Sequence, residues 1–88
     1  MSETYDRLKA RLEDQDWPSV YLFKFIVPNQ SDLVARTTAL FDDGTDLSYQ
    51  PSKNGKYVSV SAREFMLNPD SVIQRYVEAG KIEGLIAL

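Results

Sequence analysis

Residues 51–60 read PSKNGKYVSV and hold the strongest turn signal in the chain. Asn54-Gly55 stands between two strand-like segments, and this dipeptide favours a β-hairpin because a type I′ turn needs positive φ at both central positions. Lys53 and Lys56 raise the alternative of a phosphate-binding loop. Such a loop carries several glycines and leads into a helix, whereas this stretch has one glycine and leads into a strand. The stretch therefore predicts a hairpin with solvated lysines at its tip.

The segments around this turn have the patterns of strands. Residues 45–50 precede the turn, and residues 56–65 follow it with polar and apolar side chains in a period of two. Residues 19–27 are rich in aromatic and β-branched residues, which favours a further strand, and residues 81–88 are expected to form the last one. The side chains of the first strand that we assign to the core are Tyr21, Phe23, Phe25 and Val27. Val58, Val60 and Ala62 alternate with polar residues as in a half-buried strand, and the main apolar members of the last strand are Ile82, Ile86 and Leu88.

Two segments between these strands have helical spacing. A helix over residues 31–42 is predicted to start at a cap from Asn29 or Ser31 and to end at Gly44 in a left-handed conformation. A second helix over residues 69–79 has Asn68 as its cap, Pro69 in its first position and Gly80 at its end.

A third helix is predicted at the start of the chain, over residues 2–16, with Ser2 as its cap. Its apolar stripe is narrow and consists of Tyr5, Leu8 and Leu12. We expect this helix to lie on the body of the domain or on a partner.

The order of the remaining elements is β-α-β-β-α-β, which predicts an α+β fold of the ferredoxin-like plait type. In this plait two helices cover one face of a four-stranded antiparallel sheet. Residues 17–88 would form this single domain, and residues 1–16 a helical extension. The other face of the sheet is expected to meet solvent or a partner.

Composition narrows the classes of function. The chain has 88 residues, a net charge of −3 and no cysteine or histidine. Disulfides, thiolate nucleophiles and imidazole metal ligands are therefore excluded, and the acidic balance disfavours nucleic acid and anionic lipid. The charged start lacks the apolar region of a secretory signal, and no segment has the roughly 20 apolar residues of a membrane span. We expect a soluble, cytoplasmic protein.

The uncovered face of the sheet is the main candidate site. It is predicted to carry Leu22, Lys24, Ile26, Tyr57, Ser59, Ser61 and Arg63. RNA-binding plaits stack bases on several aromatic side chains of this face, and Tyr57 is the lone aromatic here. A mixed face of this kind suits contact with a protein, although scattered exposed apolar residues are also normal on any surface.

Catalytic patterns are weak. Asp42, Asp43 and Asp46 resemble a helix end and polar turn more than a metal loop, which would alternate its ligands regularly. Ser59 or Ser61 with Lys56 lacks the spacing of a nucleophile and its base. The pairs Arg63-Glu64 and Lys9-Glu13 are interpreted as solvated surface charges. We therefore predict no enzyme activity, no metal and no cofactor.

The hairpin also carries a family resemblance. Ser52, Gly55, Lys56, Tyr57, Ser59 and Val60 match a Ser-x-x-Gly-Lys-Tyr-x-Ser-Val pattern. The chain thereby resembles the small bacterial YbeD-like family over about residues 17–88, with a similar aromatic strand at residues 21–25. The resemblance implies a ferredoxin-like fold similar to the ACT regulatory domains, which bind amino acids between paired domains. It implies no catalytic residues.

Two functions follow as hypotheses. The first is a non-enzymatic regulatory or interaction module, which pairs with itself or with another protein through the uncovered face. The second is an ACT-like sensor of an amino acid or organic acid, held by Asn29, Gln30 and Ser31 at a helix N-terminus. The glycine-containing loop of ACT ligand sites is missing from residues 27–30, which favours the first hypothesis.

Overall fold

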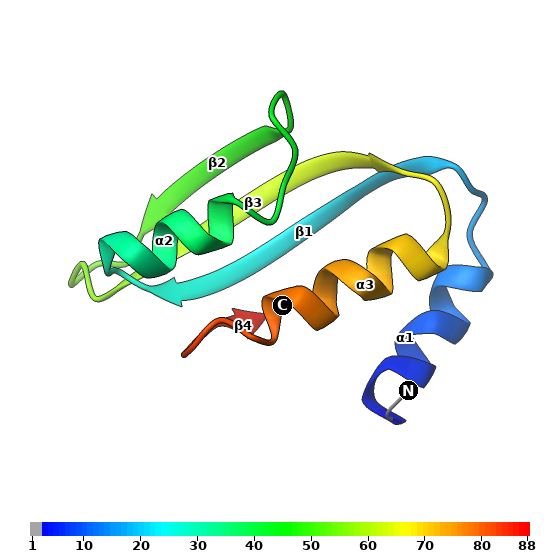
Figure 1. The fold of residues 1–88 in the computed structure, drawn as a ribbon, viewed down its shortest axis with the longest axis horizontal. Helices are drawn as coiled ribbons and strands as arrows, with labels where there is room; N and C mark the ends of the chain where they lie inside the picture. Colours follow the sequence, from blue (N-terminus) through cyan, green and yellow to red (C-terminus); the bar gives the residue numbers. More distant parts are fainter. Residues whose placement is uncertain (1–2) are drawn as a thin grey trace.

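The computed structural model describes residues 3–88 as three helices and four strands. In chain order these are α1 Glu3–Glu13, β1 Ser19–Pro28, α2 Ser31–Thr38, β2 Asp46–Pro51, β3 Tyr57–Met66, α3 Pro69–Ala79 and β4 Ile86–Ala87 (Figure 1). The predicted α+β class is confirmed. Ser2, the predicted cap of the first helix, lies outside the described residues.

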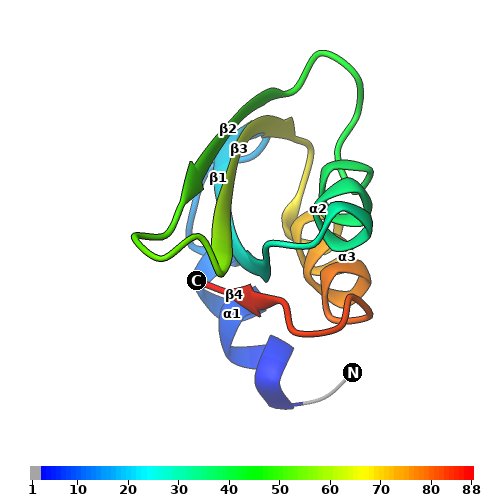
Figure 2. The same cartoon turned by 90° about the vertical axis from the view of Figure 1, so that its left-hand side faces the viewer.

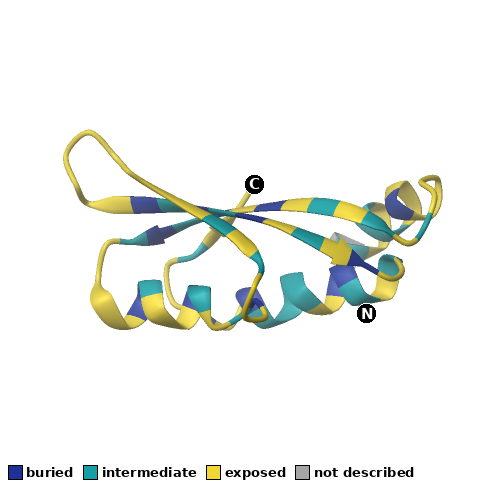
Figure 3. Ribbon diagram, turned by 90° about the horizontal axis from the view of Figure 1, so that it is seen from above, coloured by how far each residue is buried: buried dark blue, intermediate teal, exposed yellow. Residues whose placement is uncertain are grey.

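The strands form one antiparallel sheet in the order β2-β3-β1-β4. The two long strands β1 and β3 are central and pair along their whole length, with Phe23 opposite Ala62 and Phe25 opposite Val60. Helices α2 and α3 lie together on one side of the sheet (Figure 2). The opposite side carries no helix within residues 3–88 (Figure 3).

The core lies between the sheet and these helices. Burial alternates along β1 and β3 as predicted, and Phe23, Phe25 and Val60 are fully buried (Figure 3). An aromatic cluster forms around Phe23 and Phe25, whose ring centroids lie 5.7 and 6.0 Å from that of Phe41. These distances fall in the range in which aromatic pairs attract each other.

Helix α1 packs on its own domain. Leu12 is 1% exposed within the core, and Tyr5 and Leu8 pack against it, so the predicted stripe is confirmed. Lys9 Nζ lies 3.0 Å from Asp70 Oδ1 of α3, and this carboxylate raises the pKa of Lys9. The predicted pairing of Lys9 with Glu13 is wrong, because α1 lies beside α3.

Helix α2 begins at Ser31 as predicted, but its cap and its end differ from the prediction. Gln30 is its N-cap and makes no side-chain cap bond, and Asn29 Nδ2 instead donates to the Gly55 carbonyl at 2.9 Å. The helix ends at Thr38, and the chain then turns to bury Phe41. Gly44 does have a φ of +90°, but it lies in the loop beyond the helix.

Helix α3 matches its prediction of residues 69–79. The Asn68 side chain accepts a bond from the Ser71 backbone N–H at 2.8 Å, and Pro69 opens the helix. Gly80 ends it with a φ of −63°, so no left-handed conformation is needed there.

The last strand is much shorter than the predicted 81–88. Only Ile86 and Ala87 pair with β1, because the chain turns through Gly84 with a φ of +76°. Ile82 is buried in this turn, whereas Ile86 and Leu88 are 53% and 63% exposed. Of the three main apolar residues of the predicted strand, only Ile82 therefore belongs to the core.

Candidate functional site

The side of the sheet that faces away from α2 and α3 is called the open face below. Paired residues in antiparallel strands point to the same side, so the register between β1 and β3 defines its rows. Leu22 lies opposite Arg63, Lys24 opposite Ser61, Ile26 opposite Ser59, and Pro28 opposite Tyr57. The structure thus brings the seven predicted face residues together, and each of them is exposed or half-buried.

Three apolar residues of the open face were missed in the sequence. Val20 and Phe65 lie opposite each other at one end, 58% and 62% exposed. Both follow the same two-residue alternation as the predicted face residues, so the pattern could have identified them. Ile86 lies opposite Ile26 and was missed because the last strand was predicted too long and its residues were not placed on either face.

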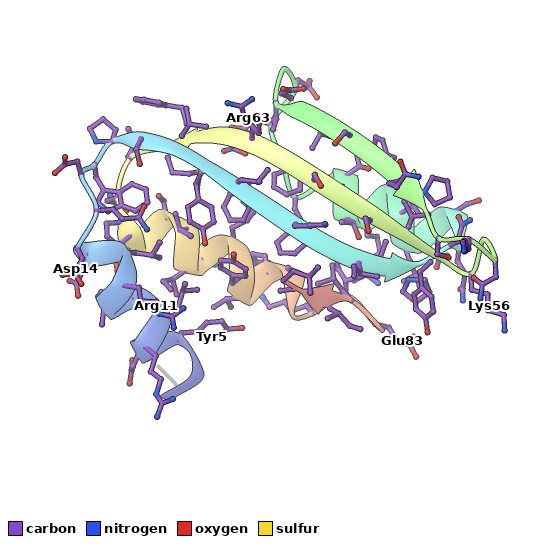
Figure 4. The ribbon with its side chains drawn as sticks, turned by 180° about the vertical axis from the view of Figure 1, so that it is seen from behind. Tyr5, Arg11, Asp14, Lys56, Arg63 and Glu83 are labelled. Carbon is purple, nitrogen blue, oxygen red and sulfur yellow. The ribbon has the colours of Figure 1, made fainter. Side chains whose placement is uncertain are left out.

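Strand β2 adds a polar margin to the open face. Asp46, Ser48 and Gln50 lie opposite Arg63, Ser61 and Ser59, respectively. The middle of the face is therefore lined by small hydroxyl side chains, while its apolar side chains lie on β1, on β4 and at the ends of β3. Figure 4 views the sheet from this side, with Arg63 near one end and Lys56 at the hairpin tip.

The charges of the open face are Lys24, Arg63 and Asp46, all exposed. The ion pairs among the side chains of residues 5–88 are Lys9–Asp70, Glu64–Arg75 and Lys81–Glu78. None of these includes a charge of the open face. The two cations and the anion are thus available to a binding partner.

Glu64 has a different role from the one predicted. Its side chain points toward the helices, because neighbouring residues of a strand face opposite sides. It accepts two bonds from the Arg75 guanidinium, at 2.7 and 2.9 Å, and this guanidinium lowers the pKa of Glu64. Arg75 also lies over the Phe41 and Phe23 rings, 4.9 and 5.3 Å from their centroids. The predicted solvated pair of Arg63 with Glu64 is wrong.

Three hollows lie on the helix side of the sheet. An open cleft of about 530 Å³ lies beside the Glu64–Arg75 pair and includes Asp42 in its wall, but Ser71 and Gln74 there are already bonded to Asn68 and Glu78. An apolar hollow of about 340 Å³ lies between α1, α3 and the C-terminal segment, lined partly by Leu8. A third, of about 280 Å³, is lined by residues of α2, α3 and the turn after α3.

The predicted catalytic patterns are not assembled. Among the hydrogen bonds of residues 3–88, none joins Lys56 Nζ to Ser59 or Ser61. No group of three or more potential metal-ligating side chains is present in the same residues. Asp46 instead belongs to the open face, and Asp42 and Asp43 lie in the loop before β2.

The proposed ligand residues lie at the start of α2. Asn29, Gln30 and Ser31 are exposed, and the Asn29 side chain and backbone N–H are both used to bind the hairpin, through Gly55 and Lys56. Asp32 adds a negative charge in the first turn of the helix. A carboxylate ligand would therefore meet an anion there.

The hairpin motif has a structural role. Ser52, Gly55 and Lys56 lie in the five-residue loop between β2 and β3, and Tyr57 opens β3. In this loop Asn54 Oδ1 accepts from the Lys56 N–H, and Ser52 Oγ accepts from the Tyr57 N–H. Gly55 has a φ of +73°, but Asn54 does not have positive φ. The predicted type I′ turn is wrong, because a loop of this length is built on a different turn followed by one left-handed residue.

Among residues 3–88, no helix combines the length and apolar character that a membrane span requires. Comparison of the chain with protein-family models, with curated proteins and with solved structures finds no match. The resemblance to the YbeD-like family therefore stays a prediction. The open face is the feature of the molecule that bears on function.

Proposed function

We propose that the protein is a non-enzymatic interaction module that binds a protein through the open face of its sheet. One observation carries this proposal. Eight large hydrophobic side chains of the described chain are exposed, and five lie on the open face: Val20, Leu22, Tyr57, Phe65 and Ile86. Exposed apolar side chains gathered on one surface mark sites of protein contact, whereas single ones are ordinary.

The arrangement of the elements supports the same proposal. After α1 they run β-α-β-β-α-β, and β1 and β3 are the inner strands of the sheet. We interpret this arrangement as a ferredoxin-like plait, in keeping with the YbeD-like resemblance. In a plait of this kind both helices pack on one face of the sheet, so the opposite face is accessible to a partner. The proposal includes a regulatory role and a cytoplasmic location.

A small-ligand sensor is the weaker proposal. Its residues at the α2 N-terminus include Asn29, whose amide already donates to Gly55, and Asp32 in the first turn opposes an anion. Thermal shifts with amino acids and organic acids test it, because a ligand that binds only the native state raises the midpoint. A shift that Asn29→Ala abolishes would favour the sensor over the interaction module.

A matched pair of tyrosines tests the interaction module. Tyr57 on the open face is 44% exposed and Tyr49 on the other side of the sheet is 45% exposed. We expect immobilised Tyr57→Glu protein to lose protein partners that the wild type and Tyr49→Glu both retain. Circular dichroism and thermal unfolding establish that both variants are folded. Equal binding by the two variants would contradict the proposal.

A further inference from the structure

From the charges of the open face we infer that its partner is a second copy of this chain, docked so that Asp46 of each copy lies against Lys24 of the other. This inference rests on the proposed function and adds the identity of the partner. It starts from the fact that the face carries both signs of charge. A face built for a strongly acidic or basic partner would carry one sign only.

The positions of the two charges suit a two-fold axis. Asp46 lies opposite Arg63 on β3, and Arg63 lies opposite Leu22 on β1, one row from Lys24. Neighbouring strands are about 4.8 Å apart and one row corresponds to about 7 Å along a strand, so Asp46 and Lys24 are separated by roughly 12 Å on the face. An axis midway between them exchanges the two positions and forms two identical ion pairs, as an isologous interface requires.

The open face is less repulsive between two copies than the rest of the surface. The net charge of the chain is −3, whereas the open face carries two cations and one anion, so the acidic excess lies elsewhere and repels its own copy more strongly. Two open faces still share a small net positive charge, so their attraction depends on setting Asp46 against Lys24, and these pairs determine how the copies are oriented.

Apolar contact supplies the affinity for this arrangement. Val20 and Leu22 are more than half exposed on β1, and both lie near the row of Asp46. Ser59 and Ser61 in the middle of the face are small, which allows two sheets to approach to the roughly 10 Å of a packed sandwich. Charged pairs then determine the register of the copies more than the strength of the dimer.

A charge exchange tests the inference on the purified full chain. Sedimentation is measured from about 1 to 500 μM, the range of weak dimers, in buffer of physiological salt. We expect a wild-type dimer and an increase in Kd of about 10-fold or more for Lys24→Glu and for Asp46→Lys, because each opposes like charges. The double variant Lys24→Glu/Asp46→Lys is expected to restore dimerisation. Lys53→Glu, on the exposed hairpin turn, makes the same change of net charge as Lys24→Glu and should leave Kd unchanged.

The outcomes separate this inference from the proposed function. A wild-type chain that stays monomeric over the whole range overturns the second copy as partner, while partners lost by Tyr57→Glu would still support the module. A dimer that the double variant fails to restore overturns the Asp46–Lys24 docking. A dimer that Tyr57→Glu and Leu22→Glu leave intact overturns the use of the open face, and with it both proposals.

Discussion

Replacing Arg75 with methionine should be among the most destabilising changes of a charged residue in this protein. Arg75 joins α3 to β3 through two bonds to Glu64, and the two side chains are only 15% and 14% exposed. Methionine keeps an unbranched apolar stem near the Phe23 and Phe41 rings. It removes the charge, so Glu64 remains mostly buried with only a weak bond of 3.4 Å from the Thr45 hydroxyl.

The size of the expected loss of stability follows from the burial of the Glu64–Arg75 pair. Removing one partner of a fully buried ion pair costs about 3–5 kcal/mol, and the partial exposure here reduces this to about 2–3 kcal/mol. The loss of the cation–π contacts is included in that figure, at about 0.5–1 kcal/mol. For a domain of this size we expect a fall in Tm of roughly 10–20 °C.

A double-mutant cycle in urea measures the pair itself. Glu64→Gln keeps the shape of the side chain and should cost about 1–2 kcal/mol, and the double variant should cost less than the sum by about 1 kcal/mol or more. Lys81→Met is the control, because its pair with Glu78 is exposed and worth little. A coupling energy below about 0.5 kcal/mol would refute the reasoning.

The pH dependence of the free energy of unfolding gives a second measurement of the same ion pair. Arg75 lowers the pKa of Glu64 from its ordinary value of 4.5. A carboxyl group with a lowered folded-state pKa contributes stability above its unfolded pKa and loses it as pH falls through the folded pKa. The free-energy difference between wild type and Glu64→Gln should therefore be constant near neutral pH and shrink below about pH 4.5. A difference that does not change with pH would contradict this assignment.

Three further predictions concern the fold. Burial raises the pKa of Tyr76, so wild-type stability should fall as pH rises above about 10, and Tyr76→Phe should fall less steeply in urea titrations across that range. Asn68→Ala removes the α3 cap and should cost about 1 kcal/mol in the free energy of unfolding; an unchanged urea midpoint would contradict the capping role. Gly84→Ala should destabilise more than Gly44→Ala, since both have positive φ but only the new Cβ at Gly84 would lie 2.8 Å from Pro28 Cγ. Equal thermal midpoints for these two variants would show that the contact with Pro28 is relieved without cost.

Local patterns determined the first three strands, most of the core and most of the open face. Alternation along residues 56–65 placed Val58 and Val60 inside and Ser59 and Arg63 outside, because neighbouring side chains of a strand point to opposite sides wherever the strand lies. The cap at Asn68 was predictable for a similar reason, since its bond reaches only three residues along the chain.

Only the tertiary structure decided which distant groups meet. Glu64 binds Arg75, which lies eleven residues away on α3, and Lys9 pairs with Asp70. Asn29 donates to the hairpin and does not cap α2. The turn at Gly84 reduced the last strand to two paired residues and left Ile86 on the open face. Such contacts depend on how whole elements pack against one another, and this packing cannot be predicted from the few residues on either side of each position.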